Sequence, residues 1–269
     1  MSAPISPVVS LDRVSKVFGG KQALHDVSAT IHPGQFVAVI GPSGAGKTTL
    51  LRCLSRATTV SAGAIRFGAV DLAALTGAAL REHRAGVGMI YQQFNLVRRL
   101  PVMDNVLVGR LPHLRSWRRW AALARWFDAA QRATALRCLD HVGLVEKVWR
   151  RADTLSGGEQ QRVAIAKLLA QSPRMILADE PVASLDVLNG RLVMDTLQRI
   201  AAQAGLTVVA TLHHVEYARG YADRVLGLRA GRLVFNGPPG DLTDAMLTHI
   251  FGEYLGPLES PLTPKVSVA

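Results

Sequence analysis

A glycine-rich segment has the residue types and spacing of a phosphate-binding loop. It reads Gly41-Pro42-Ser43-Gly44-Ala45-Gly46-Lys47-Thr48 and fits the pattern G-x-x-x-x-G-K-[ST]. Its glycines let the backbone turn tightly, so that successive N–H groups point inward at phosphate oxygens. The start of the helix expected after it adds roughly half a positive charge. We expect Lys47 to reach the β and γ phosphates of a nucleotide and the Thr48 hydroxyl to bind Mg²⁺.

Two adjacent carboxylates, Asp179 and Glu180, directly follow the apolar run 175–178. In a phosphate-binding enzyme, the carboxylate that organises Mg²⁺ stands at the carboxyl end of a strand beside the loop. Two neighbouring carboxylates can divide the work, because one can hold the metal ion while the other polarises the attacking water. An acidic pair at a strand end is otherwise commonly just solvated. Beside an intact phosphate loop, we favour the catalytic interpretation.

The elements that must position these residues follow from hydrophobic periodicity. Residues 8–14 and 23–31 have the composition of strands, and the second is closed by Pro33-Gly34. The continuous apolar run 36–40 predicts a strand buried on both faces of a parallel sheet, followed by a helix from about Lys47. Further strands are predicted at 65–67, 87–91, 175–178, 206–212, 225–228 and 231–235, the last in a hairpin ending at Asn236-Gly237. From 101 to about 155, helical periodicity with many Ala, Leu and Arg predicts an inserted helical lobe.

Length and composition set wider bounds. The 269 residues, 49% of them hydrophobic, suit one α/β domain with an inserted lobe. Cys53 and Cys138 make neither a disulfide framework nor a metal site. Residues 1–7 lack a basic stretch followed by an apolar run, and no apolar stretch reaches the about 18–20 residues of a spanning helix, so we expect the cytoplasm. The net charge of +11 indicates either a polyanionic partner or simply solubility.

A second segment, Leu155-Ser156-Gly157-Gly158-Glu159-Gln160-Gln161-Arg162, resembles the signature motif of the ATP-binding-cassette (ABC) family. Other matches occur in the family's order and at its spacing. Gln92 resembles the Q-loop glutamine and Ser184-Leu185-Asp186 resembles the D-loop. His213 resembles the switch histidine, and Phe18 stands where the family places an aromatic ring against adenine. The resemblance covers about residues 8–254.

The resemblance implies an α/β fold: a RecA-like P-loop NTPase core, an N-terminal antiparallel β-subdomain and an inserted α-helical subdomain. The ABC ATPase domain would span 8–254, with the helical subdomain at about 94–160 and a flexible tail at 255–269. It also implies a homodimer or pseudo-dimer of cassettes that holds two ATP molecules with Mg²⁺, each signature facing the other subunit's phosphate loop.

The resemblance assigns roles residue by residue. The implied ATP contacts are Phe18, Gly41, Pro42, Ser43, Gly44, Ala45, Gly46, Lys47, Thr48 and Thr49, with Ser156, Gly157 and Gly158 acting in trans. The implied Mg²⁺ ligands are Thr48, Gln92 and Asp179, and the implied catalytic residues are Glu180, His213, Gln92 and Lys47. Gln93 and His214 are adjacent alternatives, although spacing from Glu180 favours His213. Phe18 is alternatively a core aromatic residue.

Softer similarities concern the transported cargo. Phe94-Asn95-Leu96-Val97 and the stretches 176–186, 193–197 and 211–218 resemble the phosphonate-import ATPases. This resemblance implies a peripheral subunit at the cytoplasmic face of the inner membrane that is bound to integral permease subunits and served indirectly by a periplasmic binding protein. Alternatives are an accessory ATPase of a soluble carbon–phosphorus lyase complex and an amino-acid importer. We do not expect a nucleic-acid partner, because ABC proteins acting there usually carry two cassettes or long coiled-coil insertions.

The segment 114–127 allows two interpretations. Trp117, Trp120 and Phe127 fall near helical spacing, with Arg118, Arg119 and Arg125 between them. A basic amphipathic helix of this kind lies against anionic headgroups or against membrane subunits. The alternative, which we favour, is an ordinary lobe helix whose apolar stripe packs inward.

Overall fold

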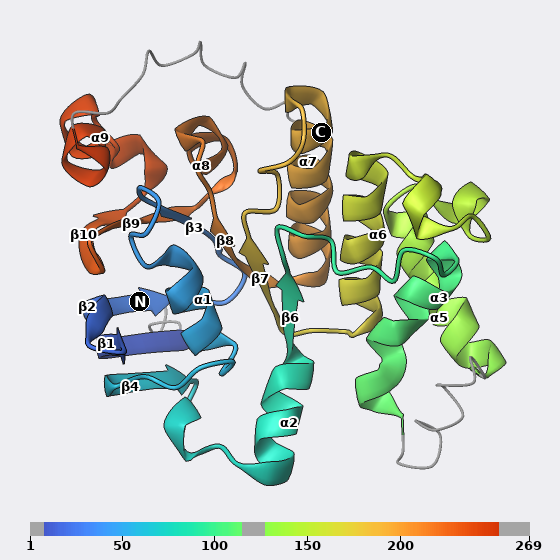
Figure 1. The fold of residues 1–269 in the computed structure, drawn as a ribbon, viewed down its shortest axis with the longest axis horizontal. Helices are drawn as coiled ribbons and strands as arrows, with labels where there is room; N and C mark the ends of the chain where they lie inside the picture. The colour runs from blue at the N-terminus through green and yellow to red at the C-terminus, as the bar shows by residue number, and fades with distance from the viewer. Residues whose placement is uncertain (1–7, 115–126, 253–269) are drawn as a thin grey trace, which may run out of the picture. The chain divides into compact units, whose positions relative to one another are not determined.

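The computed structural model describes residues 8–114 and 127–252 (Figure 1). The described residues divide into two compact units: one lies within residues 1–75 and 207–269, and the other within residues 76–206. The predicted tail 255–269 lies outside the described residues. The same holds for Trp117, Trp120, Arg118, Arg119 and Arg125, so neither interpretation of the segment 114–127 is tested.

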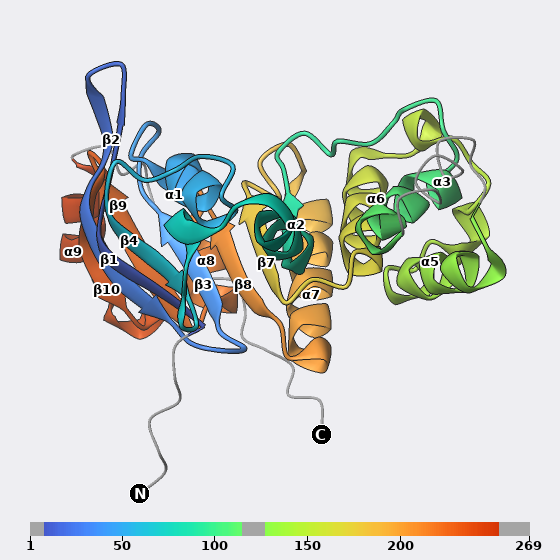
Figure 2. The ribbon, with the colours of Figure 1, turned by 90° about the horizontal axis from the view of Figure 1, so that it is seen from below.

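The first unit contains an antiparallel sheet near the N-terminus (Figure 2). Its strands are β1 (Val9–Phe18), β2 (Lys21–Ile31), β4 (Ala62–Phe67) and β5 (Val70–Asp71), in the order β2-β1-β4-β5. Strand β1 extends beyond its predicted end at residue 14, because it forms a hairpin with β2 in which Phe18 pairs with Lys21. Gly19 and Gly20 close the hairpin with φ angles of 50° and 83°, which glycine adopts without steric cost.

A largely parallel group of strands forms the core of the first unit. Strand β3 (Phe36–Ile40) lies between β8 (Thr207–Thr211) and β9 (Arg224–Arg229) and is parallel to both, while β10 (Arg232–Gly237) is antiparallel to β9. Every residue of β3 and β8 is buried, which confirms the prediction of strands covered on both faces. Among the described residues of this unit, the α-helices are α1 (Lys47–Leu54), α8 (Val215–Tyr221) and α9 (Asp244–Phe251).

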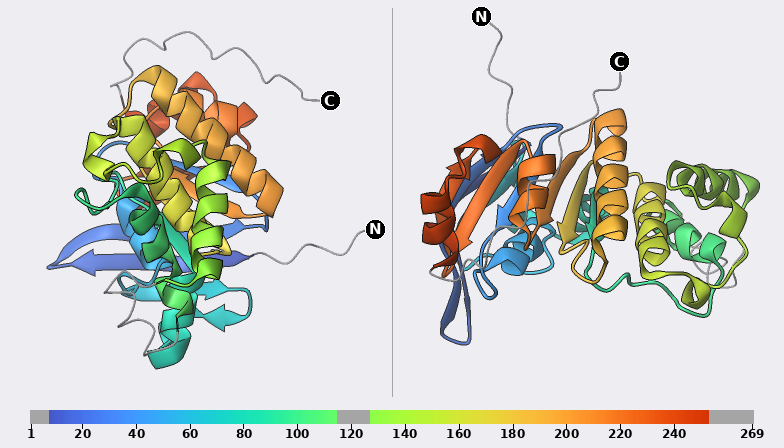
Figure 3. Two further views of the ribbon diagram at one scale, coloured as in Figure 1. Left: turned by 90° about the vertical axis from the view of Figure 1, so that its right-hand side faces the viewer. Right: turned by 90° about the horizontal axis from the view of Figure 1, so that it is seen from above.

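The second unit combines two parallel strands with a group of helices. Strands β6 (Val87–Ile90) and β7 (Met175–Asp179) pair in parallel. The α-helices in the described part of this unit are α2 (Gly77–Gly86), α3 (Val102–Leu107), α5 (Ala129–His141), α6 (Gly157–Ala170) and α7 (Val187–Ala204). Helices α3, α5 and α6 pack on one another, and α7 runs alongside α6 (Figures 1 and 3). Short 3-10 helices complete the two units: Leu72–Ala74, Val108–His113, Val145–Lys147, Ala152–Thr154 and Pro239–Asp241.

Local side-chain contacts define the ends of the helices in the second unit. Asp128 and Asp186 cap α5 and α7 by accepting backbone N–H bonds, from Gln131 at 2.9 Å and from Asn189 at 3.0 Å. Gly205 ends α7 with a φ of 62°. The helical texture predicted from residue 101 is confirmed, whereas the subdomain bounds of about 94–160 stay a prediction. Within the described residues, no helix is long and apolar enough to cross a membrane.

Candidate active site

The phosphate-binding loop joins β3 to α1 in a conformation that requires glycine at two positions. Gly41 has a φ of 148°, and a Cβ there would lie 2.1 Å from the carbonyl oxygen of Leu228. Gly46 has a φ of 103°, and a Cβ there would lie 2.5 Å from the carbonyl oxygen of Ala23. Since real Cβ atoms do not approach so closely, the loop backbone is held tightly against β2 and β9. This is the form that a backbone phosphate cradle needs.

Lys47 is the first residue of α1, and its side chain turns back along the loop. The residue is 5% exposed, and its Nζ donates hydrogen bonds to the carbonyl oxygens of Gly41, at 2.7 Å, and Pro42, at 3.0 Å. A buried ammonium group held over a turn of backbone is suited to binding a polyphosphate. Thr48 and Thr49 follow, half-buried, in the first turn of the same helix.

Two further predicted site residues lie in the first unit. The Phe18 ring is 46% exposed, with the Lys16 ammonium 4.7 Å from its centroid. This exposure argues against the core-aromatic alternative. His213 stands two residues after the end of β8, and the N–H of the intervening Leu212 donates a hydrogen bond to the carbonyl of Val39 in β3. His213 and the phosphate loop therefore leave from the carboxyl ends of neighbouring parallel strands, the usual place for a ligand site in an α/β sheet.

In the second unit, Gln92 and Asp179 also lie at the carboxyl ends of two neighbouring parallel strands. Ile90 of β6 pairs with Ala178 of β7, so Gln92 and Asp179 both follow at the carboxyl end of this strand pair. Their amide and carboxylate oxygens are donors of the kind that hard cations prefer. Glu180 comes next with a φ of 51°, a left-handed conformation that is uncommon for a residue with a side chain. Such backbone outliers cluster at functional sites.

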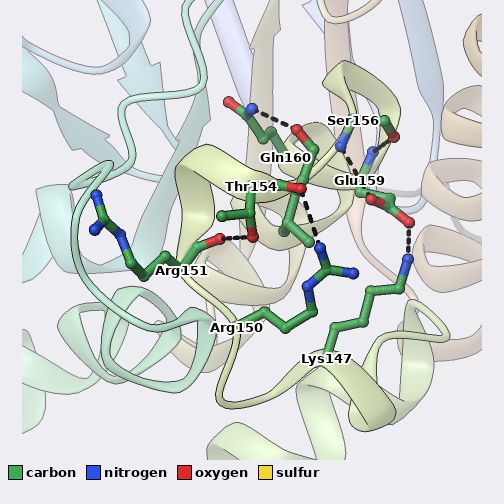
Figure 4. A network of polar contacts seen from close by, with 8 residues as sticks. Lys147, Arg150, Arg151, Thr154, Ser156, Glu159 and Gln160 are labelled. Atoms are coloured by element: carbon green, nitrogen blue, oxygen red, sulfur yellow. Dashed lines mark hydrogen bonds and ion pairs between the residues drawn. The ribbon is translucent and has the colours of Figure 1, made fainter.

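Ser156 is the N-cap of helix α6 (Figure 4). The glycine pair of the second motif, Gly157 and Gly158, directly follows it as the first two residues of that helix. The Ser156 hydroxyl oxygen accepts the Glu159 N–H at 3.3 Å, and the Glu159 carboxylate accepts the Ser156 N–H at 3.0 Å. A Cβ on Gly157 would lie 3.4 Å from Leu185 and 3.9 Å from Phe94. The fold thus brings together three stretches that the sequence separates: the one after Gln92, the glycine pair, and Ser184-Leu185-Asp186.

Comparison with known protein families identifies the family to which the phosphate loop and the signature segment belong. A family model described as "ABC transporter" matches residues 24–183. The chain belongs to the ABC transporter family. It is an ABC-type ATPase cassette.

Curated relatives match this cassette over nearly their whole length. It is 50% identical over 234 residues to a protein of Rhodopseudomonas palustris (strain BisB5), a match that covers 87% of this chain and 86% of the relative. It is 44% identical over 258 residues to one of Rhizobium meliloti (strain 1021), covering 96% and 91%. Both relatives are named "Phosphonates import ATP-binding protein PhnC".

Solved structures carry the same fold. The cassette is 31% identical to the ATP-binding cassette MJ0796, solved as a dimer in a post-hydrolysis state bound to ADP and Pi. That match covers 86% of this chain and 98% of the other, with a TM-score of 0.74. A cbiO1 structure from Clostridium perfringens, 22% identical, matches in fold with a TM-score of 0.79 over 91% of this chain and 94% of the other.

Two residues near the cassette's motifs were not predicted from the sequence. Asn105, 1% exposed in α3, accepts the Val97 N–H at 2.7 Å and donates to the Pro101 carbonyl at 3.1 Å, which secures the stretch that follows Gln92. The sequence did offer a sign that Asn105 has a specific role: it stands within an apolar helical run, although asparagine disfavours helix interiors. Lys147 pairs with Glu159, and nothing in the sequence pattern marks it.

Proposed function

We propose that this cassette is the ATP-hydrolysing subunit of a membrane importer of phosphonates or related phosphorus oxyanions. The ATPase part rests on the phosphate loop, in which glycine is sterically required and Lys47 is held over the turn. The cargo rests on relatives that are 44–50% identical and named for phosphonate import.

Binding of ATP is the first step of the proposed mechanism. The exposed Phe18 ring would stack on adenine, while Lys47 and the N–H groups of 41–48 bind the phosphates. Thr48, Gln92 and Asp179 would hold Mg²⁺, and their oxygen donors fit this hard cation. When bound, Mg²⁺ neutralises phosphate charge. Thr49, beside Thr48 in α1, would contribute to the same phosphate site.

Hydrolysis would proceed by positioning and charge stabilisation. Glu180 would accept a proton from the attacking water as the water oxygen bonds to the γ phosphorus. The bond between that phosphorus and the β–γ bridging oxygen would break in the same step, so that ADP leaves and inorganic phosphate is formed. His213 would contact the γ phosphate and stabilise the charge that develops on its oxygens. Ser156 and the N–H groups of Gly157 and Gly158 would donate to the same phosphate from a second cassette, so the functional unit would be a homodimer.

In the cell, we propose that the cassette dimer is peripheral, at the cytoplasmic face of the inner membrane, bound to integral permease subunits. The cargo would reach those subunits from a periplasmic binding protein and would not touch this chain. This chain would then contribute to transport only by binding and hydrolysing ATP. The residue to change in a test is therefore Glu180, the carboxylate proposed to accept the proton from water.

The test is uptake of a labelled alkylphosphonate by cells that lack the native gene and carry either the wild type or Glu180→Gln. We expect the wild type to restore uptake and the variant to fail, although purified Glu180→Gln still binds ATP. Normal uptake without the gene, combined with failed growth on phosphonate, would assign the protein to an intracellular degradation complex. If neither uptake nor growth changes, the proposed cargo is wrong. Wild-type hydrolysis by Glu180→Gln would overturn the role of that carboxylate.

A further inference from the structure

At the start of α6, Glu159 is paired with the ammonium group of Lys147. Neither the helix cap nor the phosphate contact proposed for Ser156 requires this ion pair. Glu159 uses one carboxylate oxygen, Oε2, to accept the Ser156 N–H at 3.0 Å. The other oxygen, Oε1, accepts a charged hydrogen bond from the Lys147 ammonium (Figure 4). The Lys147 side chain is 33% exposed and that of Glu159 18%, so solvent screens this pair only in part.

The capping contacts determine how the Ser156 hydroxyl can be used. Its oxygen accepts the backbone N–H of Glu159 at 3.3 Å, which occupies a lone pair. The hydroxyl hydrogen is not needed for that bond and remains available for donation to an acceptor such as a phosphate oxygen. The capping box therefore prepares Ser156 as a donor at the positive end of the helix.

The same capping box carries a cost for an anionic ligand. Glu159 places a full negative charge within the first turn of α6, where the helix dipole otherwise attracts anions. An unpaired carboxylate there would repel a phosphate that approaches Ser156. The Lys147 ammonium cancels this charge while leaving the bond from Ser156 to Glu159 in place. Consistent with the contact, the Lys147 hydrogen bond is the main cause that lowers the pKa of Glu159.

Lys147 is itself held by the backbone around it. Its carbonyl accepts the Arg150 N–H at 2.9 Å, and the next residue, Val148, accepts the Met103 N–H of α3 at 2.9 Å. The lysine thus belongs to a segment fixed against α3, while its partner belongs to α6. We propose that Lys147 is a positioning residue that neutralises Glu159, so that the capped Ser156 can receive the γ phosphate of ATP. This inference rests on the proposed function, in which Ser156 binds that phosphate.

A double-mutant cycle on the purified full chain tests the proposal, using Lys147→Met, Glu159→Gln and the double variant. Glutamine at this position keeps the capping box but removes the charge. We expect Lys147→Met to raise the apparent KM for ATP about five- to twentyfold with little change in kcat, because unpaired Glu159 repels the bound and reacting phosphate alike. Salt should reduce the defect. In the Glu159→Gln background, the same lysine change should have no effect on KM.

Arg151→Met is the matched control. Arg151 pairs with Asp153 in the same region through two hydrogen bonds, of 3.1 Å and 2.5 Å, and among the described residues no hydrogen bond of this network joins either residue to Ser156. We expect the KM of this control variant to equal that of the wild type. An equal KM for Lys147→Met and the wild type would overturn the proposal. So would a double variant as impaired as Lys147→Met, since this would mean that Lys147 acts through packing and not through the charge of Glu159.

A second measurement separates failure of this inference from failure of the proposed function. The ¹³C resonance of the Glu159 carboxyl, followed from pH 7 to pH 2, reports its pKa without any hydrolysis. We expect Lys147→Met to raise that pKa, and an unchanged pKa would overturn the pairing. A wild-type chain that shows no ATPase activity would instead overturn the proposed function, while the titration would still decide whether the pair forms.

Discussion

The ammonium group of Lys47 lies 2.7 Å from the carbonyl oxygen of Gly41, to which it donates a hydrogen bond within one loop. Gly41 directly follows β3 and Lys47 is the first residue of α1, so this bond joins the two ends of the phosphate-binding loop. The loop therefore holds the Lys47 ammonium close to its own backbone, at 2.7 Å from the carbonyl oxygen of Gly41 and 3.0 Å from that of Pro42. Pre-organised charge of this kind is a large contributor to catalysis.

The first prediction concerns that cation. Lys47→Met keeps a side chain of similar length but removes the charge, so we expect kcat for ATP hydrolysis to fall by at least about 100-fold. Arg52→Met is the control, because it removes an exposed cation from the last turn of the same helix. Steady-state ATPase assays on both variants check the prediction. If kcat fell by a similar factor in both variants, the loss would come from the lower net charge of the protein and not from the position of Lys47.

The second prediction distinguishes two reasons for glycine in the loop: lack of space for a Cβ, and a backbone φ that other residues rarely adopt. Gly41→Ala would place a Cβ 2.1 Å from the Leu228 carbonyl oxygen, whereas a Cβ at Gly44 would meet no atom within 4 Å, although its φ is 77°. We expect Gly44→Ala to lower the free energy of unfolding by about 1–2 kcal/mol from backbone strain alone. Gly41→Ala should cost more than that, because the backbone of β9 must also move. Urea unfolding measures both, and equal losses would contradict the close approach.

The third prediction concerns the two cysteines. Burial raises the pKa of Cys53 to about 11, despite the opposing effect of Lys16, and burial also raises the pKa of Cys138. Both thiols are therefore neutral and poorly nucleophilic at pH 8. We expect neither to react with iodoacetamide in the native protein and both to react in urea, as mass spectrometry would show. Gln203→Cys, exposed in α7, should be alkylated at once and serves as the positive control.

The fourth prediction follows from the lowered pKa of Glu159, which is caused mainly by Lys147. Because folding depresses this pKa, the unfolded chain binds the proton more tightly than the native one does. The pair's contribution to stability is therefore fully present above the ordinary glutamate pKa of 4.5 and is lost as the pH falls through the lower native value. Thermal unfolding of the wild type and Lys147→Met should differ at pH 6 and converge towards pH 3. Curves that stay parallel over this range would contradict the prediction.

Some elements could be predicted from the sequence because residues within a few positions of one another determine them. The apolar run of β3 and the glycines of the phosphate loop lie within a few consecutive residues, so their pattern indicates strand, turn and helix start directly. The cap at Ser156 is equally local, with Glu159 three residues away. In contrast, the strand expected to end at residue 14 runs to Phe18, because its last residues gain partners in β2 that the periodicity of β1 alone does not reveal.

The sequence by itself therefore determined the phosphate loop, the signature segment, the buried strands and the family to which they point. The tertiary structure alone decided which distant residues support them. It placed the Leu228 carbonyl against Gly41, the Asn105 amide against the stretch after Gln92, and the Lys147 ammonium against Glu159. The physical reason is that motifs arise from interactions along a few consecutive residues, whereas these contacts depend on the path by which the chain returns to the site.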